Sequence, residues 1–231
     1  MSISNESRAR IKQVFEPIAL GLGRLGLTPD GLTLIGFGIT VIGAALLAGQ
    51  LWLAGGIVVF LGGVFDMFDG TLARATGKVS PLGAFMDSVF DRLGEGIVYL
   101  GIVIGTVFAN FDEAAILATA AMGAAFMVSY TRSKSEGLGF TSGTRMGAVG
   151  VMPREVRLVI LCLGLIVMGV LGTPILQPID GSACVESCVQ PGGLVLVGVL
   201  GIIAGGSIVT VIQRILHVRS QARSATTPTI H

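Results

Sequence analysis

Four aspartates lie in two closely spaced pairs in the first half of the chain. Asp66 and Asp69 are three residues apart, and Asp87 and Asp91 are four apart. At these spacings each pair shares one face of a helix. Carboxylates grouped in this way, with no Cys or His beside them, are typical ligands of Mg²⁺ or Mn²⁺. The spacing therefore predicts a divalent metal site.

A purely structural role for four such carboxylates would be costly in a membrane. One Asp at the centre of a transmembrane helix costs about 2.5–3.5 kcal/mol, so four facing lipid would cost on the order of 10 kcal/mol. The alternative is that they are helix-capping or interfacial aspartates beside Arg74 and Arg92, which fits one pair more easily than two. Gly70, Ala73 and Gly83 are small enough to let a phosphate-bearing ligand approach the backbone.

The composition indicates a membrane protein. The chain of 231 residues is 52% hydrophobic and 13% charged, whereas soluble domains are about 25% charged. Glycine contributes 35 residues, and small residues allow helices to pack closely in a bilayer. These values exclude a soluble enzyme, a secreted disulfide scaffold and a nucleic-acid-binding protein. We expect an all-α integral membrane protein with residues 1–231 in one membrane-embedded domain.

Uncharged stretches predict six transmembrane helices. Residues 31–65 contain no charged side chain, which is too long for one crossing of about 20 residues. Gly49 and Gln50 offer a turn between a helix near 32–49 and another near 51–75. The further uncharged stretches are 96–111, 114–131, 158–179 and 187–213. The first aspartate pair ends the second helix and the second pair begins the third, so the four carboxylates converge at one end of an antiparallel pair.

The positive charges predict the orientation. All fifteen Lys and Arg residues lie in the terminal segments, in the 74–80 and 132–157 connections, or on helix ends that lead to them. The opposite connections contain none. By the positive-inside rule we expect a multi-pass cell-membrane protein whose termini and aspartates are cytoplasmic.

The two ends of the chain and its outer loop carry further expectations. Residues 1–30 form a cytoplasmic segment in which 5–25 mix bases with apolar side chains, as in an amphipathic helix lying on the membrane. The polar residues 220–231 read as a disordered tail. Cys184 and Cys188 lie in an outer loop, either as a disulfide or as two free thiols.

The aspartates belong to a longer pattern, D-x2-D-G-x2-A-R-x8-G-x3-D-x3-D, which runs from Asp66 to Asp91. This segment resembles the signature of the CDP-alcohol phosphatidyltransferases. The resemblance implies a fold of six membrane helices, commonly a homodimer. It also implies a reaction in which an alcohol attacks the β-phosphorus of a CDP-linked lipid and CMP leaves.

The resemblance also implies a role for each residue of the site. Asp66, Asp69 and Asp87, with Asp91 shared, would hold two Mg²⁺ or Mn²⁺ ions against the pyrophosphate, and Asp91 stands where the family has its general base. Asp30, whose alternative role is as a helix N-cap, belongs to the segment that borders the cytidine. The residues expected to contact the CDP-lipid are Asp30, Gly31, Leu32, Thr33, Asp69, Gly70, Ala73, Arg74 and Ser80. For Glu95, a supporting role beside the metal site and a pairing with Arg92 both remain open.

Basic residues at other helix ends bear on the acceptor alcohol. A phosphorylated alcohol needs several Arg or Lys donors, whereas a neutral alcohol does not. Flanking charge of the positive-inside kind is the alternative explanation. The residues expected to bind an acceptor phosphate are Arg132, Lys134, Arg154, Arg157 and Arg214.

Their segments resemble the phosphatidylinositol phosphate synthase branch of the same family. The resemblance implies transfer of the phosphatidyl group of CDP-diacylglycerol to inositol 1-phosphate. Glycerol 3-phosphate, giving phosphatidylglycerol phosphate, is the alternative acceptor. A non-enzymatic cation transporter is the alternative from another class, but the outer halves of the helices are too apolar for a pore.

Overall fold

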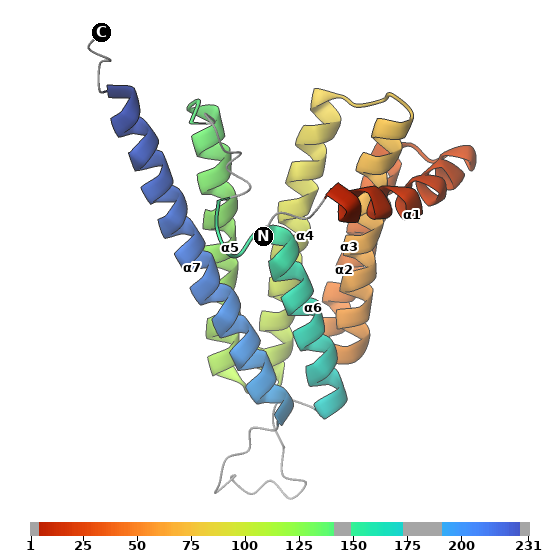
Figure 1. Ribbon diagram of the computed structural model, residues 1–231. Helices are drawn as coiled ribbons and strands as arrows, with labels where there is room; N and C mark the ends of the chain where they lie inside the picture. Colours follow the sequence, from red (N-terminus) through yellow and green to blue (C-terminus); the bar gives the residue numbers. More distant parts are fainter. Residues whose placement is uncertain (1–4, 141–148, 173–190, 227–231) are drawn as a thin grey trace, which may run out of the picture.

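The protein is a bundle of long helices with one further helix lying across one side of it (Figure 1). The computed structural model describes residues 5–140, 149–172 and 191–226, and these residues contain helices and no strands. The helices are α1 (Asn5–Arg24), α2 (Pro29–Ala48), α3 (Trp52–Ala75), α4 (Pro81–Phe108), α5 (Asp112–Gly137), α6 (Arg154–Leu171) and α7 (Pro191–Thr226). The predicted all-α class is confirmed for the described residues.

Helices α2 to α7 correspond one to one with the six predicted apolar segments. The turn expected at Gly49 and Gln50 separates α2 from α3, and Gln50 adopts a positive φ of 62° there. Helices α4 and α7 extend further than the uncharged stretches that predicted them. Their additional turns carry charged side chains and lie at the end of the bundle nearest α1 (Figure 1).

Four helices are long and apolar enough to cross a membrane: α2, α3, α5 and α7. Helices α4 and α6 carry charged residues up to about their midpoints, namely Asp87, Asp91, Arg92 and Glu95 in α4 and Arg154, Glu155 and Arg157 in α6. Large apolar side chains are exposed on the outer surfaces of the bundle, for example Ile42, Leu100, Ile116 and Ile202. An apolar exterior of this extent suits lipid better than water.

The helices pack around a core in which neighbours in space are often distant in sequence. Helix α2 packs on α3 and α4, α3 on α6, and α7 on both α5 and α6. Tyr99, Ile102, Leu165, Met168 and Leu200 are fully buried in this core. Helix α1 lies across one side of the bundle and packs on α3 (Figure 1), where Phe15, Ala19 and Leu22 meet Phe68 and Leu72.

A close approach of α2 and α4 depends on the absence of a side chain at Gly101. A Cβ atom at this position would collide with the carbonyl oxygen of Ala44 and lie 3.0 Å from its carbonyl carbon. Backbone atoms cannot move aside without shifting a helix. The pair α2–α4 carries residues of the aspartate region at its far end, so this contact helps to fix the site.

We expect Gly101→Ala to destabilise the protein by about 1–3 kcal/mol, because an added methyl group in a filled contact forces the two backbones apart. Thermal unfolding in detergent measures the effect. The matched control is Gly123→Ala in α5, where a Cβ would meet no atom within 4 Å and the change should stay within about 0.5 kcal/mol. Equal midpoints for the two variants would contradict the close contact.

The structure describes part of the predicted C-terminal tail and neither of the two cysteines of the outer loop. The predicted disordered tail 220–231 differs in part, because residues 220–226 continue α7. Ala, Arg and Gln in this stretch are good helix formers and extend the helix beyond its apolar part. Residues 227–231, and the proposed pair Cys184 and Cys188, lie outside the described residues.

Candidate active site

Three of the four predicted metal ligands form a compact carboxylate cluster. One carboxylate oxygen from each of Asp66, Asp69 and Asp87 lies within 4.8 Å of the other two. Asp66 and Asp69 stand in the second half of α3, and Asp87 stands in the second turn of α4. The short connection between α3 and α4 brings the two segments to the same end of the bundle. The two helices are not the packed neighbours that the sequence predicts, because both pack on α2 and barely on each other.

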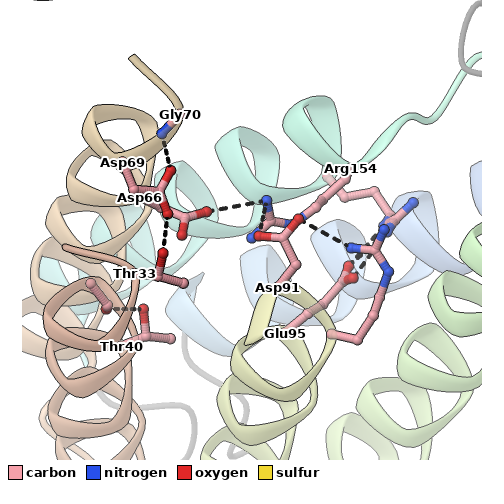
Figure 2. Close-up of polar contacts among 11 residues, drawn as sticks. Thr33, Thr40, Asp66, Asp69, Gly70, Asp91, Glu95 and Arg154 are labelled. Atoms are coloured by element: carbon pink, nitrogen blue, oxygen red, sulfur yellow. Dashed lines mark hydrogen bonds and ion pairs between the residues drawn. The ribbon is translucent and has the colours of Figure 1, made fainter. Parts of the chain in front are cut away.

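Asp69 is the most buried member of this cluster and is held from two sides. Its side chain is 6% exposed. The hydroxyl of Thr33 in α2 donates a hydrogen bond of 2.5 Å to Oδ2, and the backbone N–H of Gly70 donates to Oδ1 (Figure 2). These two donors orient the carboxylate toward Asp66 and Asp87. A ligand held in a fixed direction binds a metal ion more tightly than a freely rotating one.

Asp91 lies across the site from this cluster, on α4, and is joined to it through an arginine. The Nη1 atom of Arg154 lies 2.6 Å from Oδ1 of Asp91 and 3.5 Å from Oδ2 of Asp66 (Figure 2). Arg92 Nη1 lies 3.6 Å from the other oxygen of Asp91. Two carboxylates from different helices thus share one cation, which offsets part of their mutual repulsion.

The donor set fits one or more divalent cations. One oxygen from each of three carboxylates lies within 4.8 Å of the others, and a cation between them stabilises their ionised forms against mutual repulsion. Hard carboxylate oxygens suit Mg²⁺ or Mn²⁺. Asp91 and Asp66 already approach a common cation in Arg154, so their oxygens are arranged for a shared positive ligand.

A cavity of about 250 Å³ opens beside Asp69 and Asp87, between the beginnings of α2 and α4 and the end of α3. We call it the α2–α4 cavity. Its lining residues are Pro29, Asp30, Thr33, Asp69, Gly70, Ala73, Arg74, Lys78, Val79, Ser80, Gly83, Ala84 and Asp87.

Two capped helix N-termini border this cavity. Thr28 caps α2 by accepting a hydrogen bond of 3.1 Å from the N–H of Gly31, and Ser80 caps α4 by accepting one of 3.0 Å from Gly83. Both helices begin with a proline, which suits the first helical position. The alternative role of Asp30 as the N-cap is wrong, because Asp30 lies inside the first turn and lines the cavity.

Most of the residues predicted to contact the CDP-lipid line the α2–α4 cavity. Two of them do not. Leu32 is fully buried and packs with Phe68 and Leu72, and Gly31 serves the cap of α2. Lys78 lines the cavity but was not predicted, since its position between two helices resembles ordinary flanking charge.

A second and larger cavity, of about 760 Å³, lies between α4 and α5. We call it the α4–α5 cavity. Asp87, Asp91 and Arg92 stand on its α4 wall, and Ser129 and Arg132 stand on its α5 wall, among other residues. Asp87 lines both this cavity and the α2–α4 cavity. The carboxylate cluster therefore lies at the boundary between two separate spaces.

The five basic residues predicted to bind an acceptor phosphate occupy different environments. Arg132 lines the α4–α5 cavity and pairs with Glu136 at 3.1 Å, and Arg154 contacts the aspartates. Lys134 is exposed and does not line that cavity. Arg157 is 1% exposed and Arg214 is 3% exposed.

The donor groups of these two buried arginines face protein acceptors. Arg214 donates from Nε to the carbonyl oxygen of Val149 at 3.0 Å and from Nη1 to that of Val128. Arg157 is paired with Glu95. The sequence indicates Arg92 as a possible partner of Glu95 but not Arg157, because Arg157 is 62 residues away along the chain.

The family model of CDP-alcohol phosphatidyltransferases matches residues 26–185. The chain belongs to this family. The match includes the whole aspartate signature and both helices that carry it.

Among curated relatives, an archaetidylinositol phosphate synthase of Pyrococcus horikoshii is 38% identical over 154 residues, covering 67% of this chain and 77% of the relative. A phosphatidylinositol phosphate synthase of Mycobacterium tuberculosis is 37% identical over 161 residues, covering 68% of this chain and 71% of the relative. One of Streptomyces avermitilis is 30% identical over 234 residues, covering 96% and 85%.

Solved structures of a Mycobacterium tuberculosis phosphatidylinositol phosphate synthase share the fold. A crystal structure with CDP-DAG bound has a TM-score of 0.70 at 29% identity, covering 89% of this chain and 94% of that one. A structure of the same enzyme in complex with manganese and citrate has a TM-score of 0.69, covering 89% of each chain.

Proposed function

We propose that this enzyme transfers the phosphatidyl group of CDP-diacylglycerol to inositol 1-phosphate, releasing CMP and forming phosphatidylinositol phosphate. The observation that carries the proposal is the position of the carboxylate cluster between two cavities that share Asp87. A transfer between two substrates needs them to meet at the reacting phosphorus, and this arrangement provides one space for each.

The α2–α4 cavity is the proposed site of the CDP part of the donor. Arg74 and Lys78 supply positive charge to the pyrophosphate, while Gly70, Ala73 and Gly83 leave the backbone accessible. The relative with CDP-DAG bound has the same fold, which supports this donor. The ether-linked analogue belongs in the same assay, because one relative is named an archaetidylinositol phosphate synthase.

The α4–α5 cavity is the proposed site of the acceptor. Arg132 lines this cavity, and Arg154, which lies outside it, contacts Asp91 on its α4 wall. Charge-assisted hydrogen bonds from arginine suit a phosphate dianion. Lys134, Arg157 and Arg214 remain candidates from their sequence pattern. The names of the relatives favour inositol phosphate over glycerol 3-phosphate as the acceptor.

The aspartates are proposed to hold two divalent ions, Mg²⁺ or Mn²⁺, with Asp66, Asp69, Asp87 and Asp91 as ligands. When bound, such ions stabilise the charge that develops on the transferred phosphate and on the leaving CMP. Asp91 faces the α4–α5 cavity and is proposed to accept the hydrogen bond of the acceptor hydroxyl, aligning its oxygen with the β-phosphorus. A relative in complex with manganese supports the metal.

We further propose that α2 to α7 all cross the membrane and that residues 1–231 form one membrane-embedded transferase domain. The aspartates, both termini and α1 would then lie on the cytoplasmic side, in accord with the one-sided distribution of Lys and Arg. Helix α1 would lie on the membrane surface as an amphipathic helix. The functional unit is proposed to be a homodimer.

The experiment that tests the function is a CMP-release assay on purified protein with CDP-diacylglycerol and Mg²⁺. Inositol 1-phosphate, free inositol and glycerol 3-phosphate are compared as acceptors, and the lipid product is weighed by mass spectrometry. We expect turnover with inositol 1-phosphate alone. Turnover only with glycerol 3-phosphate would overturn the acceptor and leave the metal site in place.

We expect Arg154→Ala to raise the KM for the acceptor by about 10–100-fold, the loss expected when one charge-assisted hydrogen bond disappears. The KM for CDP-diacylglycerol should stay within about twofold, because Arg154 does not line the α2–α4 cavity. The matched control is Arg24→Ala, an exposed arginine of α1 outside both cavities. An equal rise in both KM values would contradict the assignment.

A further inference from the structure

The helices α4 and α6 barely approach each other through their backbones, although both carry residues of the site. A small cavity of about 40 Å³ lies between them, lined by Asp91, Glu95 and Tyr99 from α4 and by Arg154 and Arg157 from α6, together with residues of α2 and α3. Direct packing between these two helices therefore contributes little to their separation beside the aspartates, and side-chain contacts across the cavity can add to it.

Two arginine–carboxylate pairs cross from α6 to α4 at this point. Arg154 pairs with Asp91, and Arg157 pairs with Glu95. The arginines are three residues apart on α6 and the carboxylates are four residues apart on α4, so the two pairs lie about one helical turn apart. Figure 2 shows Asp91 and Glu95 projecting from α4, with Asp91 against Arg154, while Glu95 pairs with Arg157.

The pair formed by Arg157 and Glu95 is held by several hydrogen bonds. Arg157 Nε donates to Oε1 of Glu95 at 2.9 Å, and Nη2 donates to Oε2 at 3.1 Å. The remaining terminal nitrogen, Nη1, donates to the carbonyl oxygen of Met152 at 3.1 Å. Arg157 is 1% exposed. A planar arginine fork that meets a carboxylate at both oxygens is a directional contact, and here it is fixed at three points.

The pair formed by Arg154 and Asp91 is held by fewer contacts. Arg154 reaches both Asp91 and Asp66 with a single nitrogen, Nη1. Its side chain is 29% exposed, and no hydrogen bond to the backbone holds it among the described contacts. Arg154 is therefore held by fewer nitrogen atoms than Arg157, which uses three.

We propose that Arg157 and Glu95 act as a strut that sets the spacing of α4 and α6, and that Arg157 positions the acceptor-binding residues without touching the acceptor. By fixing the first turn of α6 against α4, the strut holds Arg154 opposite Asp91. This assignment rests on the proposed function, in which Arg154 contacts the acceptor. It differs from the sequence-based expectation that Arg157 itself binds the acceptor phosphate.

The decisive variant is Glu95→Gln, which keeps Arg157 unchanged and removes the negative charge of the side chain that pairs with it. A strut predicts that Glu95→Gln and Arg157→Lys have the same effect: KM for the acceptor rises and kcat falls, with kcat/KM lower by about 10–100-fold, as a displacement near 1 Å can cause. The KM for CDP-diacylglycerol stays within about twofold of the wild-type value. The matched control is Glu155→Gln, an exposed residue in the same turn of α6, which should leave both KM values unchanged.

Direct binding of the acceptor by Arg157 predicts the opposite result for Glu95→Gln. The arginine would be released toward the phosphate, so the acceptor KM would stay the same or fall, while Arg157→Lys alone would raise it. That pattern would overturn the strut.

A second measurement tests the strut without any substrate. Thermal unfolding midpoints are compared for Glu95→Gln, Arg157→Gln and the double variant. Each single change leaves a buried partner uncompensated, so the double variant should unfold at a temperature no lower than the less stable single variant. Additive losses would overturn the pairing. If wild-type protein releases no CMP with inositol 1-phosphate, the proposed function fails, but this midpoint comparison still decides whether Arg157 and Glu95 stabilise the fold as a pair.

Discussion

Asp91→Asn is expected to reduce CMP release by at least about a thousandfold. Asparagine keeps the size of the side chain but removes its negative charge, and with it a proposed metal ligand and the group that aligns the acceptor hydroxyl. Asp91 faces both the α4–α5 cavity and Arg154, so no neighbouring carboxylate can replace it from the same position on α4. Initial rates of CMP release measure the effect.

The control for this variant is Asp112→Asn, the same chemical change at an exposed aspartate in the first turn of α5. It should retain the wild-type rate. Size-exclusion profiles in detergent establish that both variants are folded. A folded Asp91→Asn protein that keeps more than about a tenth of the activity would contradict the assigned role, since that loss equals only 1.4 kcal/mol.

Removal of divalent ions is expected to abolish turnover, and Mg²⁺ or Mn²⁺ is expected to restore it. In the proposed reaction, the carboxylate cluster of Asp66, Asp69 and Asp87 acts by binding the metal ions. The rate of CMP release without metal should therefore be lower by at least about a thousandfold. Chelation followed by titration with each metal measures the recovery. Binding of Mn²⁺ followed by its paramagnetic resonance signal counts the ions, and two per chain are expected.

Thr33→Val sharpens this test because it leaves every carboxylate in place. The variant removes the hydroxyl that donates to Asp69 at 2.5 Å, and metal affinity should fall by about 10–100-fold, as for other groups that orient a ligand. The matched control is Thr40→Val on the same helix, whose hydroxyl donates to the carbonyl of Gly36 at 3.0 Å. Equal metal affinity in the two variants would show that the orientation of Asp69 is unimportant.

Sequence patterns predicted the parts of this molecule that depend on local chemistry. The turn at Gln50, the six long helices and the convergence of Asp66, Asp69 and Asp87 all follow from uncharged stretches, short connections and the helical period. Charges in apolar helices are costly, so their positions carried most of the information about the site.

Contacts between distant segments could not be predicted in the same way. Arg157 pairs with Glu95 across 62 residues, and Arg214 reaches Val128 across 86. Positive charge near a helix end looks the same in a sequence whether it faces a ligand, a carbonyl group or a partner on another helix. The cap of α2 is Thr28, two residues before Asp30, and a pattern of apolar residues does not resolve a helix end to that precision.

The shared wall at Asp87 has an evolutionary consequence. Apart from α4, the α2–α4 cavity is built from residues of α2, α3 and the connection after α3, whereas the α4–α5 cavity draws its other wall from α5. With the acceptor in the α4–α5 cavity, as proposed, substitutions in α5 would alter the choice of acceptor alcohol without changing the lining of the cavity on the other side of the aspartates. A scaffold divided in this way can diversify its products while its chemistry stays under constant selection.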